Sequence, residues 1–265
     1  MTTSDSQPVR IALLQTEGSP GDVEANLQEL REAAEHAAQA GAALLLTPEM
    51  FVTGYNIGSQ LSALTALPLT ESVAEVARET GVAIAAGLPL TTDEGIVNSV
   101  AIFDRQGQQM ARYDKTHLFG ELDRSMFSAG SVPSPIIDFE GLKLGMLICY
   151  DVEFPESVRS LALQGADVVL VPTAQMAPYA FIAERTIPSR AWESQIYVAY
   201  ANHVGTEGDL TYVGRSSVTA PDGEILTMAG EEPELLFAEL DPKRVRASRE
   251  ENPYLNDRRP DLYTT

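Results

Sequence analysis

Residues 9–46 decide the fold class and read VRIALLQTEGSPGDVEANLQELREAAEHAAQAGAALLL. Val9–Gln15 is an apolar run of strand length, and residues 19–22 are turn formers that lead to a helix start. Residues 23–39 place apolar side chains at spacings of three and four, which is the period of an amphipathic helix. Gly41 ends that helix before a second apolar run at 42–46. The pattern predicts a strand–helix–strand unit.

The same alternation continues along the chain and predicts one α/β domain over residues 1–265, with residues 1–8 flexible. Hairpin-like pairs at 97–113 and 216–239 favour mixed sheets covered by helices, and they allow a second layer of sheet. Residues after 241 are polar and are expected to be irregular. Further helices are predicted at 72–80, 155–164 and 181–194, and strands at 82–86, 97–103, 109–113, 144–149, 167–171, 196–202, 216–219, 224–228 and 235–239.

Composition excludes several classes of function. The net charge of −20, from 38 acidic against 18 basic side chains, would repel nucleic acid. No apolar run approaches the ~20 residues that span a bilayer, so no membrane contact is expected. The polar start and the single cysteine make a cytoplasmic location the default, because one cysteine cannot form an internal disulfide. No cluster has metal-ligand spacing, and we expect no metal and no cofactor.

Cys149 is the first candidate for chemistry. It follows the apolar run 144–148 and precedes a helix start, where helix amides favour a thiolate. A buried, inert cysteine is the alternative reading of the same position. A histidine base would be the familiar partner of a thiol, and the residues alone leave that pairing open. The three histidines, each more typical of a structural role here, are His36, His117 and His203.

Glu49 and Lys115 occupy the same kind of place at the ends of two other strands. Glu49 follows the apolar run 42–46 and the rigid Pro48, although a solvated loop glutamate would look the same. Lys115 closes the strand at 109–113 and is one of only three lysines in the chain. A compact ammonium at that position suggests a specific task.

Three motifs together resemble the nitrilase superfamily of carbon–nitrogen hydrolases over nearly the whole chain. They are PEMF with TGY around Glu49, YDKTHLF around Lys115, and GMLICYD around Cys149. The resemblance implies a four-layer α-β-β-α sandwich, paired through helices into a homodimer. It is compatible with residues 241–265 lying at the interface of that dimer.

Residue by residue, the resemblance implies that Cys149 is the nucleophile, Glu49 the general base and Lys115 the stabiliser of the tetrahedral intermediate. Glu121 matches the second glutamate that positions substrate in many members. A small amide would pass through a Cys thioester, releasing ammonia and then the acid. The residues expected to line the substrate channel are Tyr55, Tyr150 and Met176.

The sequence around the motifs indicates which branch of the superfamily the chain resembles most. Tyr150 and Asp151 follow the cysteine, where nitrilases typically carry Trp and Glu, so an amide substrate is favoured. The chain looks most like amidases of ω-amino amides such as 5-aminopentanamide. Glu153 would suit an aminated or neutral substrate, or it merely favours the next helix N-terminus. The alternatives are a nitrilase, an N-carbamoyl amide hydrolase, a catalytically retired binding protein, and a protein with a redox-sensing Cys149.

Overall fold

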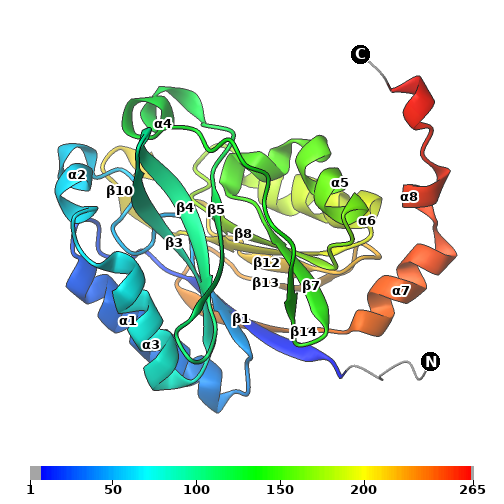
Figure 1. The fold of residues 1–265 in the computed structure, drawn as a ribbon, viewed down its shortest axis with the longest axis horizontal. Coiled ribbons are helices and arrows are strands. Elements are labelled where there is room, and N and C mark those ends of the chain that lie inside the picture. Colours follow the sequence, from blue (N-terminus) through cyan, green and yellow to red (C-terminus); the bar gives the residue numbers. More distant parts are fainter. Residues whose placement is uncertain (1–6, 264–265) are drawn as a thin grey trace.

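Two six-stranded β-sheets pack face to face between outer layers of helix (Figure 1). The structure is a computed structural model, and it describes residues 7–263. The first sheet has the order β14-β1-β2-β3-β4-β5, and the second β13-β12-β9-β8-β7-β6. Helices α1 and α3 cover the first sheet, and α5 and α6 cover the second. The predicted four-layer α-β-β-α sandwich with mixed sheets is therefore confirmed.

The strands of the first sheet are β1 (Val9–Gln15), β2 (Leu44–Leu46), β3 (Ala83–Thr92), β4 (Gly95–Phe103), β5 (Gln109–Asp114) and β14 (Glu234–Leu240). Those of the second are β6 (Ile137–Phe139), β7 (Leu142–Met146), β8 (Val168–Thr173), β9 (Tyr197–Asn202), β12 (Ser217–Thr219) and β13 (Ile225–Met228). A separate hairpin joins β10 (Thr206–Glu207) to β11 (Leu210–Thr211).

The helices are α1 (Val23–Gln39), α2 (Leu61–Leu64), α3 (Leu69–Thr80), α4 (Gly120–Met126), α5 (Pro155–Leu163), α6 (Ile187–Ser194), α7 (Pro242–Glu251) and α8 (Tyr254–Asp257). Short 3-10 helices lie at Gly58–Gln60, Cys149–Glu153 and Pro260–Leu262, and a π-helix at Ile182–Thr186 precedes α6. Within residues 7–263, no helix is both long and apolar enough to cross a bilayer.

Both sheets are built on the same plan. Each has three central parallel strands, β1-β2-β3 in one and β7-β8-β9 in the other, with antiparallel strands on either side. Because parallel strands point the same way, their carboxyl ends gather at one edge of each sheet. Loops leaving that edge therefore bring distant segments together, as active sites of α/β folds require.

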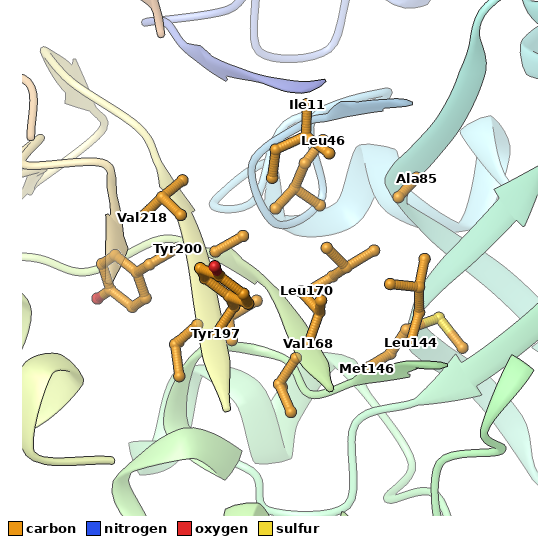
Figure 2. Close-up of a cluster of buried hydrophobic side chains, with 14 of the residues drawn as sticks. Ile11, Leu46, Ala85, Leu144, Met146, Val168, Leu170, Tyr197, Tyr200 and Val218 are labelled. Carbon is orange, nitrogen blue, oxygen red and sulfur yellow. The ribbon is translucent and has the colours of Figure 1, made fainter. Parts of the chain in front are cut away.

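The core lies between the sheets, and strand β1 shows how the sequence specifies it. Ile11 and Leu13 point into the space between the sheets, whereas Ala12 and Leu14 point toward α1 and α3. This alternation is the two-residue period of a strand buried on both faces. Figure 2 shows side chains of both sheets meeting in one apolar cluster.

Three expectations about the elements are corrected. The strand before Cys149 ends at Met146, because residues 149–153 form a 3-10 helix in place of the expected strand end. The strand expected at 235–239 is β14, which pairs with β1 in the first sheet and does not join the β12–β13 hairpin. Residues after 241 include the helix α7, which the Asp241 side chain caps by accepting from the Lys243 N–H.

The missed helix α7 has a physical explanation. It is mostly polar and buries only Pro242, Val245 and Ser248, so its apolar period is too weak to read. Asp241 and Pro242 nevertheless form a typical helix start. Residues 1–6, which hold most of the predicted flexible start at 1–8, lie outside the described residues.

Candidate active site

Glu49, Lys115 and Cys149 come from three separate segments that meet at one edge of the sandwich. Glu49 lies three residues beyond β2, and Cys149 lies three residues beyond β7. Lys115 directly follows β5. Glu49 and Lys115 follow strands of the first sheet and Cys149 follows a strand of the second, so the site lies between the two sheets. All three side chains are buried.

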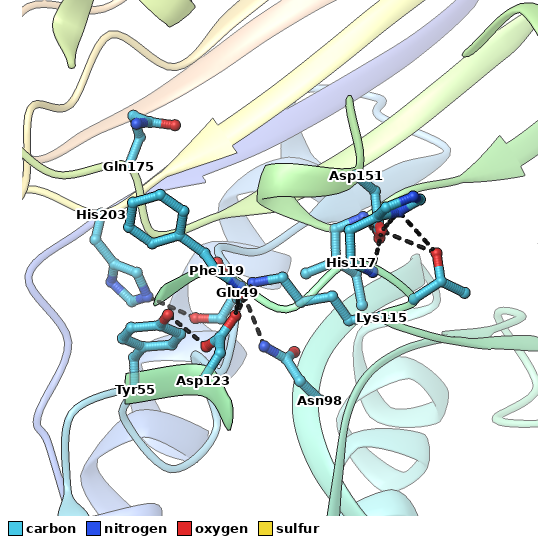
Figure 3. A network of polar contacts seen from close by, with 12 residues as sticks. Glu49, Tyr55, Asn98, Lys115, His117, Phe119, Asp123, Asp151, Gln175 and His203 are labelled. Atoms are coloured by element: carbon cyan, nitrogen blue, oxygen red, sulfur yellow. Dashed lines mark hydrogen bonds and ion pairs between the residues drawn. The ribbon is translucent and has the colours of Figure 1, made fainter. Parts of the chain in front are cut away.

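A buried ion pair joins Glu49 to Lys115 (Figure 3). The Lys115 Nζ lies 2.7 Å from Glu49 Oε1, and both side chains have an exposed fraction of 0%. The amide of Asn98, on β4, donates to the same oxygen at 2.7 Å. The other oxygen, Oε2, is buried without a hydrogen-bond partner among the described residues. One carboxylate oxygen is thus fixed, and the other is free to act on a thiol, a substrate or a water molecule.

Asp123, which the sequence reasoning missed, is the second acid at this lysine. Its Oδ2 lies 2.7 Å from Lys115 Nζ, and its Oδ1 accepts from the Tyr55 hydroxyl at 2.6 Å. The backbone N–H of Phe119 also donates to Oδ2, at 2.8 Å. Tyr55, expected to line the channel, therefore holds Asp123 in place.

Glu121, predicted to be the second acid, lies elsewhere. It is exposed on the first turn of α4, whereas Asp123 on the same helix is fully buried. Helical spacing in the sequence distinguishes the acid that is buried from the one that is exposed. Asp123 falls four residues after Phe119 and four before Phe127, so it shares a face with two apolar side chains, and Glu121 does not.

The turn that carries Glu49 sits tightly on the neighbouring strand β3. A Cβ on Gly87 would come within 2.3 Å of the Pro48 carbonyl oxygen, so only glycine permits this approach. On the other side, the His203 ring bonds the Glu49 carbonyl oxygen through Nε2 at 2.8 Å. Backbone and side chain of Glu49 are both held.

Cys149 opens the 3-10 helix with a backbone φ of 45°, a value that non-glycine residues rarely adopt. Arg190 on α6 donates from Nε to the Val152 carbonyl oxygen at 3.0 Å and from Nη2 to that of Glu153 at 2.6 Å. The turn is thus fixed by contacts beyond its own residues, as strained backbone at functional sites usually is.

Burial and charge set the proton affinities of these groups. Burial lowers the pKa of Lys115, but the charges of Glu49, Cys149 and Asp123 outweigh it, and the net pKa is raised. Burial raises the pKa of Glu49, with Lys115 opposing and Asp123 adding to the shift. Lysine is therefore the charged partner of the cluster, and Glu49 is a stronger base than an exposed carboxylate.

The pKa of the Cys149 thiol is raised, whereas the amides at a helix start were expected to favour the thiolate. Burial and then the charge of Glu49 raise it well above its usual value, while Lys115 and the Ala174 backbone N–H lower it less. The resting residue is therefore a thiol, and it needs a base to react.

None of the three histidines hydrogen-bonds the thiol within residues 7–263. His36 is exposed on α1. His203 contacts the Glu49 backbone, and burial lowers its pKa. His117 bonds Asp151 through Nδ1 at 2.7 Å, which raises the pKa of its ring. The Cys–His alternative finds no support in this geometry.

The remaining predicted channel residues lie around the buried cluster. Tyr150 is partly exposed, with its ring edge-on to Phe119 at 5.2 Å and to Phe154 at 4.9 Å between ring centroids. Met176 is partly buried and packs with Tyr55 in a third apolar cluster. Among the described residues, no group of three His, Cys, Asp or Glu side chains has the arrangement of a metal site.

Comparison with known proteins shows the family. The model of the carbon-nitrogen hydrolase family matches residues 10–250. The chain is 48% identical to a hydrolase encoded in the pqqF 5' region of Pseudomonas protegens, with 99% of this chain and 93% of that protein covered. It is 34% identical to a nitrilase of Pyrococcus abyssi, with 96% and 99% covered.

A solved structure gives the same result. The crystal structure of an amidase from Nesterenkonia sp. superposes with a TM-score of 0.86 at 36% identity, covering 97% of this chain and 96% of that one. The resemblance in the three motifs is therefore confirmed at the level of the superfamily, while the ω-amino amide branch stays a prediction. The chain belongs to the carbon–nitrogen hydrolase family, the nitrilase superfamily, and is a hydrolase enzyme.

Proposed function

We propose that the protein hydrolyses a small aliphatic amide to a carboxylic acid and ammonia through a thioester on Cys149. The observation that carries the proposal is the free oxygen of Glu49. That carboxylate is pinned by Lys115 and Asn98 at Oε1, while Oε2 has no partner among the described residues. A fixed base beside a buried thiol is the arrangement that nucleophilic catalysis by a protonated cysteine requires.

In the first half-reaction, Glu49 takes the proton of the Cys149 thiol as sulfur attacks the amide carbonyl carbon. The carbonyl oxygen becomes an oxyanion, and the ammonium of Lys115 and the backbone N–H of Tyr150 stabilise it. The C–N bond then breaks, and Glu49 returns its proton to the leaving nitrogen. Ammonia departs and the acyl group remains on sulfur as a thioester.

In the second half-reaction, water replaces ammonia. Glu49 takes a proton from the water as its oxygen attacks the thioester carbonyl. The C–S bond breaks, and Glu49 gives the proton to the departing sulfur. The carboxylic acid leaves, and the thiol is restored. Asp123, held by Tyr55, keeps Lys115 charged and oriented through both steps.

A substrate panel tests the proposal. Ammonia release would be measured with butyramide, pentanamide, 5-aminopentanamide, the corresponding nitriles and an N-carbamoyl amine. Turnover of one or more short amides, together with an acyl adduct on Cys149 detected by mass spectrometry, is the expected result. Turnover of the nitriles alone would favour the second candidate, which the likeness to the Pyrococcus nitrilase supports. Folded protein that turns over none of them would refute both.

We further propose that Glu153 favours substrates with an amino group at the far end. Its carboxylate makes no hydrogen bond or ion pair within residues 7–263, although its backbone is tied to Arg190. Burial raises the pKa of this carboxyl, and the charges of Arg190 and Lys115 lower it, so Glu153 lies within electrostatic reach of the catalytic lysine. A negative charge there would attract an ammonium group and repel a carboxylate.

Glu153→Gln should raise the KM for 5-aminopentanamide about tenfold, the equivalent of roughly 1.4 kcal/mol of lost attraction, and leave that for neutral pentanamide within about twofold. The matched control is Glu156→Gln, which removes the same charge from an exposed position three residues away. Equal shifts of KM for both substrates would contradict a charge-reading role.

The proposal includes a homodimer in the cytoplasm. Exposed aromatic side chains on α6 and α8 support an interface: Trp192 on α6 packs against Tyr254 on α8 at 5.7 Å between ring centroids, and both are exposed by more than a third. Burying such rings in a partner would remove apolar surface from water. Light scattering on the purified full chain gives the mass in solution, and a monomer at all concentrations would refute the dimer.

A further inference from the structure

Asp151 is a fully buried carboxylate that receives hydrogen bonds from the segment carrying Lys115. Its Oδ1 accepts from the Thr116 hydroxyl at 3.0 Å, the His117 backbone N–H at 2.9 Å and His117 Nδ1 at 2.7 Å. Its Oδ2 accepts from the Tyr113 hydroxyl at 2.9 Å. Donors both before and after Lys115 therefore converge on one side chain (Figure 3).

The same carboxylate also closes the turn that carries Cys149. Its Oδ2 accepts from the Ile148 backbone N–H at 3.1 Å, and its own N–H donates to the Ile148 carbonyl oxygen at 3.0 Å. Cys149 lies inside this loop of bonds, in its uncommon positive-φ conformation. The His117 ring stacks at 4.1 Å on Phe154, the residue after the 3-10 helix, so the two segments touch a second time.

These contacts matter because Cys149 and Lys115 come from different sheets. Cys149 follows β7 of the second sheet, and Lys115 follows β5, the edge strand of the first. Strand pairing fixes positions within a sheet, but it does not fix the distance between loops of two sheets. Asp151 bonds directly to both loops.

We propose that Asp151 is a positioning residue that sets the separation and orientation of Cys149 and Lys115. The inference rests on the proposed function, since it concerns the same nucleophile and the same lysine. This role affects the steps in which bonds form. Loosening the contacts of Asp151 with the two loops moves the ammonium of Lys115 away from the developing oxyanion, and a misplacement of about 1 Å is enough to lower the rate by a large factor.

Asparagine at this position cannot replace the carboxylate. Asparagine offers one acceptor oxygen and an NH₂ group, whereas both oxygens of Asp151 act as acceptors in its five contacts. An amide nitrogen facing the Ile148 N–H would set donor against donor. Asp151→Asn is therefore expected to lower kcat about tenfold or more, with KM within about threefold of wild type.

Asp167→Asn is the matched control. Asp167 also joins two segments, accepting from the Lys143 backbone N–H at 3.0 Å and from Arg249. However, it directly precedes β8 and so lies at the amino end of that strand, whereas the candidate site lies at the carboxyl ends of the parallel strands. It should lower the melting temperature and leave kcat within about twofold of wild type. A purely structural Asp151 would behave like Asp167.

The full chain and its variants would be assayed for ammonia release and thermal unfolding. A fall in kcat for Asp151→Asn alone supports the inference. Wild-type kcat in a folded Asp151→Asn variant overturns it, and so does an equal fall in both variants. If Asp151→Asn does not fold, the double variant Tyr113→Phe, Thr116→Val keeps the charge and removes two donors. Its kcat should fall about three- to tenfold, and an unchanged kcat overturns the inference.

Failure of this inference is distinguishable from failure of the proposed function. If wild-type protein turns over no amide or nitrile, the proposed function fails before any variant is made. If the wild type is active and Asp151→Asn matches it, only the positioning role fails.

Discussion

Replacing Cys149 with alanine is expected to lower kcat for a short amide about a thousandfold or more, because no other group can form the acyl-enzyme. The side chain is small and buried, so the variant should keep the fold. Ammonia release under saturating amide measures the loss, and mass spectrometry should no longer detect an acyl adduct.

Cys149→Ser provides the control for shape. It restores a nucleophilic atom in the same place, yet a hydroxyl is far harder to deprotonate than a thiol, so little activity should return. Circular dichroism and the melting temperature verify folding of both variants. An alanine variant that retains more than about one tenth of wild-type turnover would contradict a covalent role for this cysteine.

Replacing Lys115 with methionine should damage both activity and stability. The ammonium lies 2.7 Å from Glu49 and 2.7 Å from Asp123, and all three side chains are fully buried. Removing it leaves two carboxylates close together without a cation, which should cost about 3–5 kcal/mol of folding free energy. Activity should fall at least about a hundredfold through loss of oxyanion stabilisation. Urea unfolding and ammonia release measure the two effects.

The double variant Glu49→Gln, Lys115→Met separates these effects. Removing one carboxylate together with the lysine relieves part of the charge imbalance, so the double variant should unfold at higher urea than Lys115→Met alone. It should be no more active, because the base is gone as well. A double variant less stable than either single variant would show that the buried pair is not the source of the lost stability.

Much of the fold was predictable because apolar residues recur with a clear helical or strand period in many segments of this chain. Helix α1 and strand β1 were predicted with the bounds that the structure shows. Errors arose where local pattern and long-range contact disagree. Strand β3 continues to Thr92, beyond the predicted end at residue 86, because β4 pairs with it from Ile84 to Thr92. The partner of β14 was not predictable at all from local pattern.

The residues that form the candidate site could be predicted in part. Sequence motifs pointed to Glu49, Lys115 and Cys149, and the structure brings the first two into contact and buries the third beside them. Asn98 escaped notice because a polar residue within a strand has no signature until its neighbours are known. Asp123 was missed in favour of Glu121, although helical spacing separates them. The raised pKa of the thiol depends on burial, which a sequence motif does not report.

The pairing of β1 with β14 has a consequence for biosynthesis. Val9 aligns with Leu240 and Gln15 with Glu234, so the first sheet stays open on that side until residues 234–240 have left the ribosome. Until then β1 offers a bare edge on which other chains can add. Polypeptides truncated before residue 234 should therefore aggregate during translation.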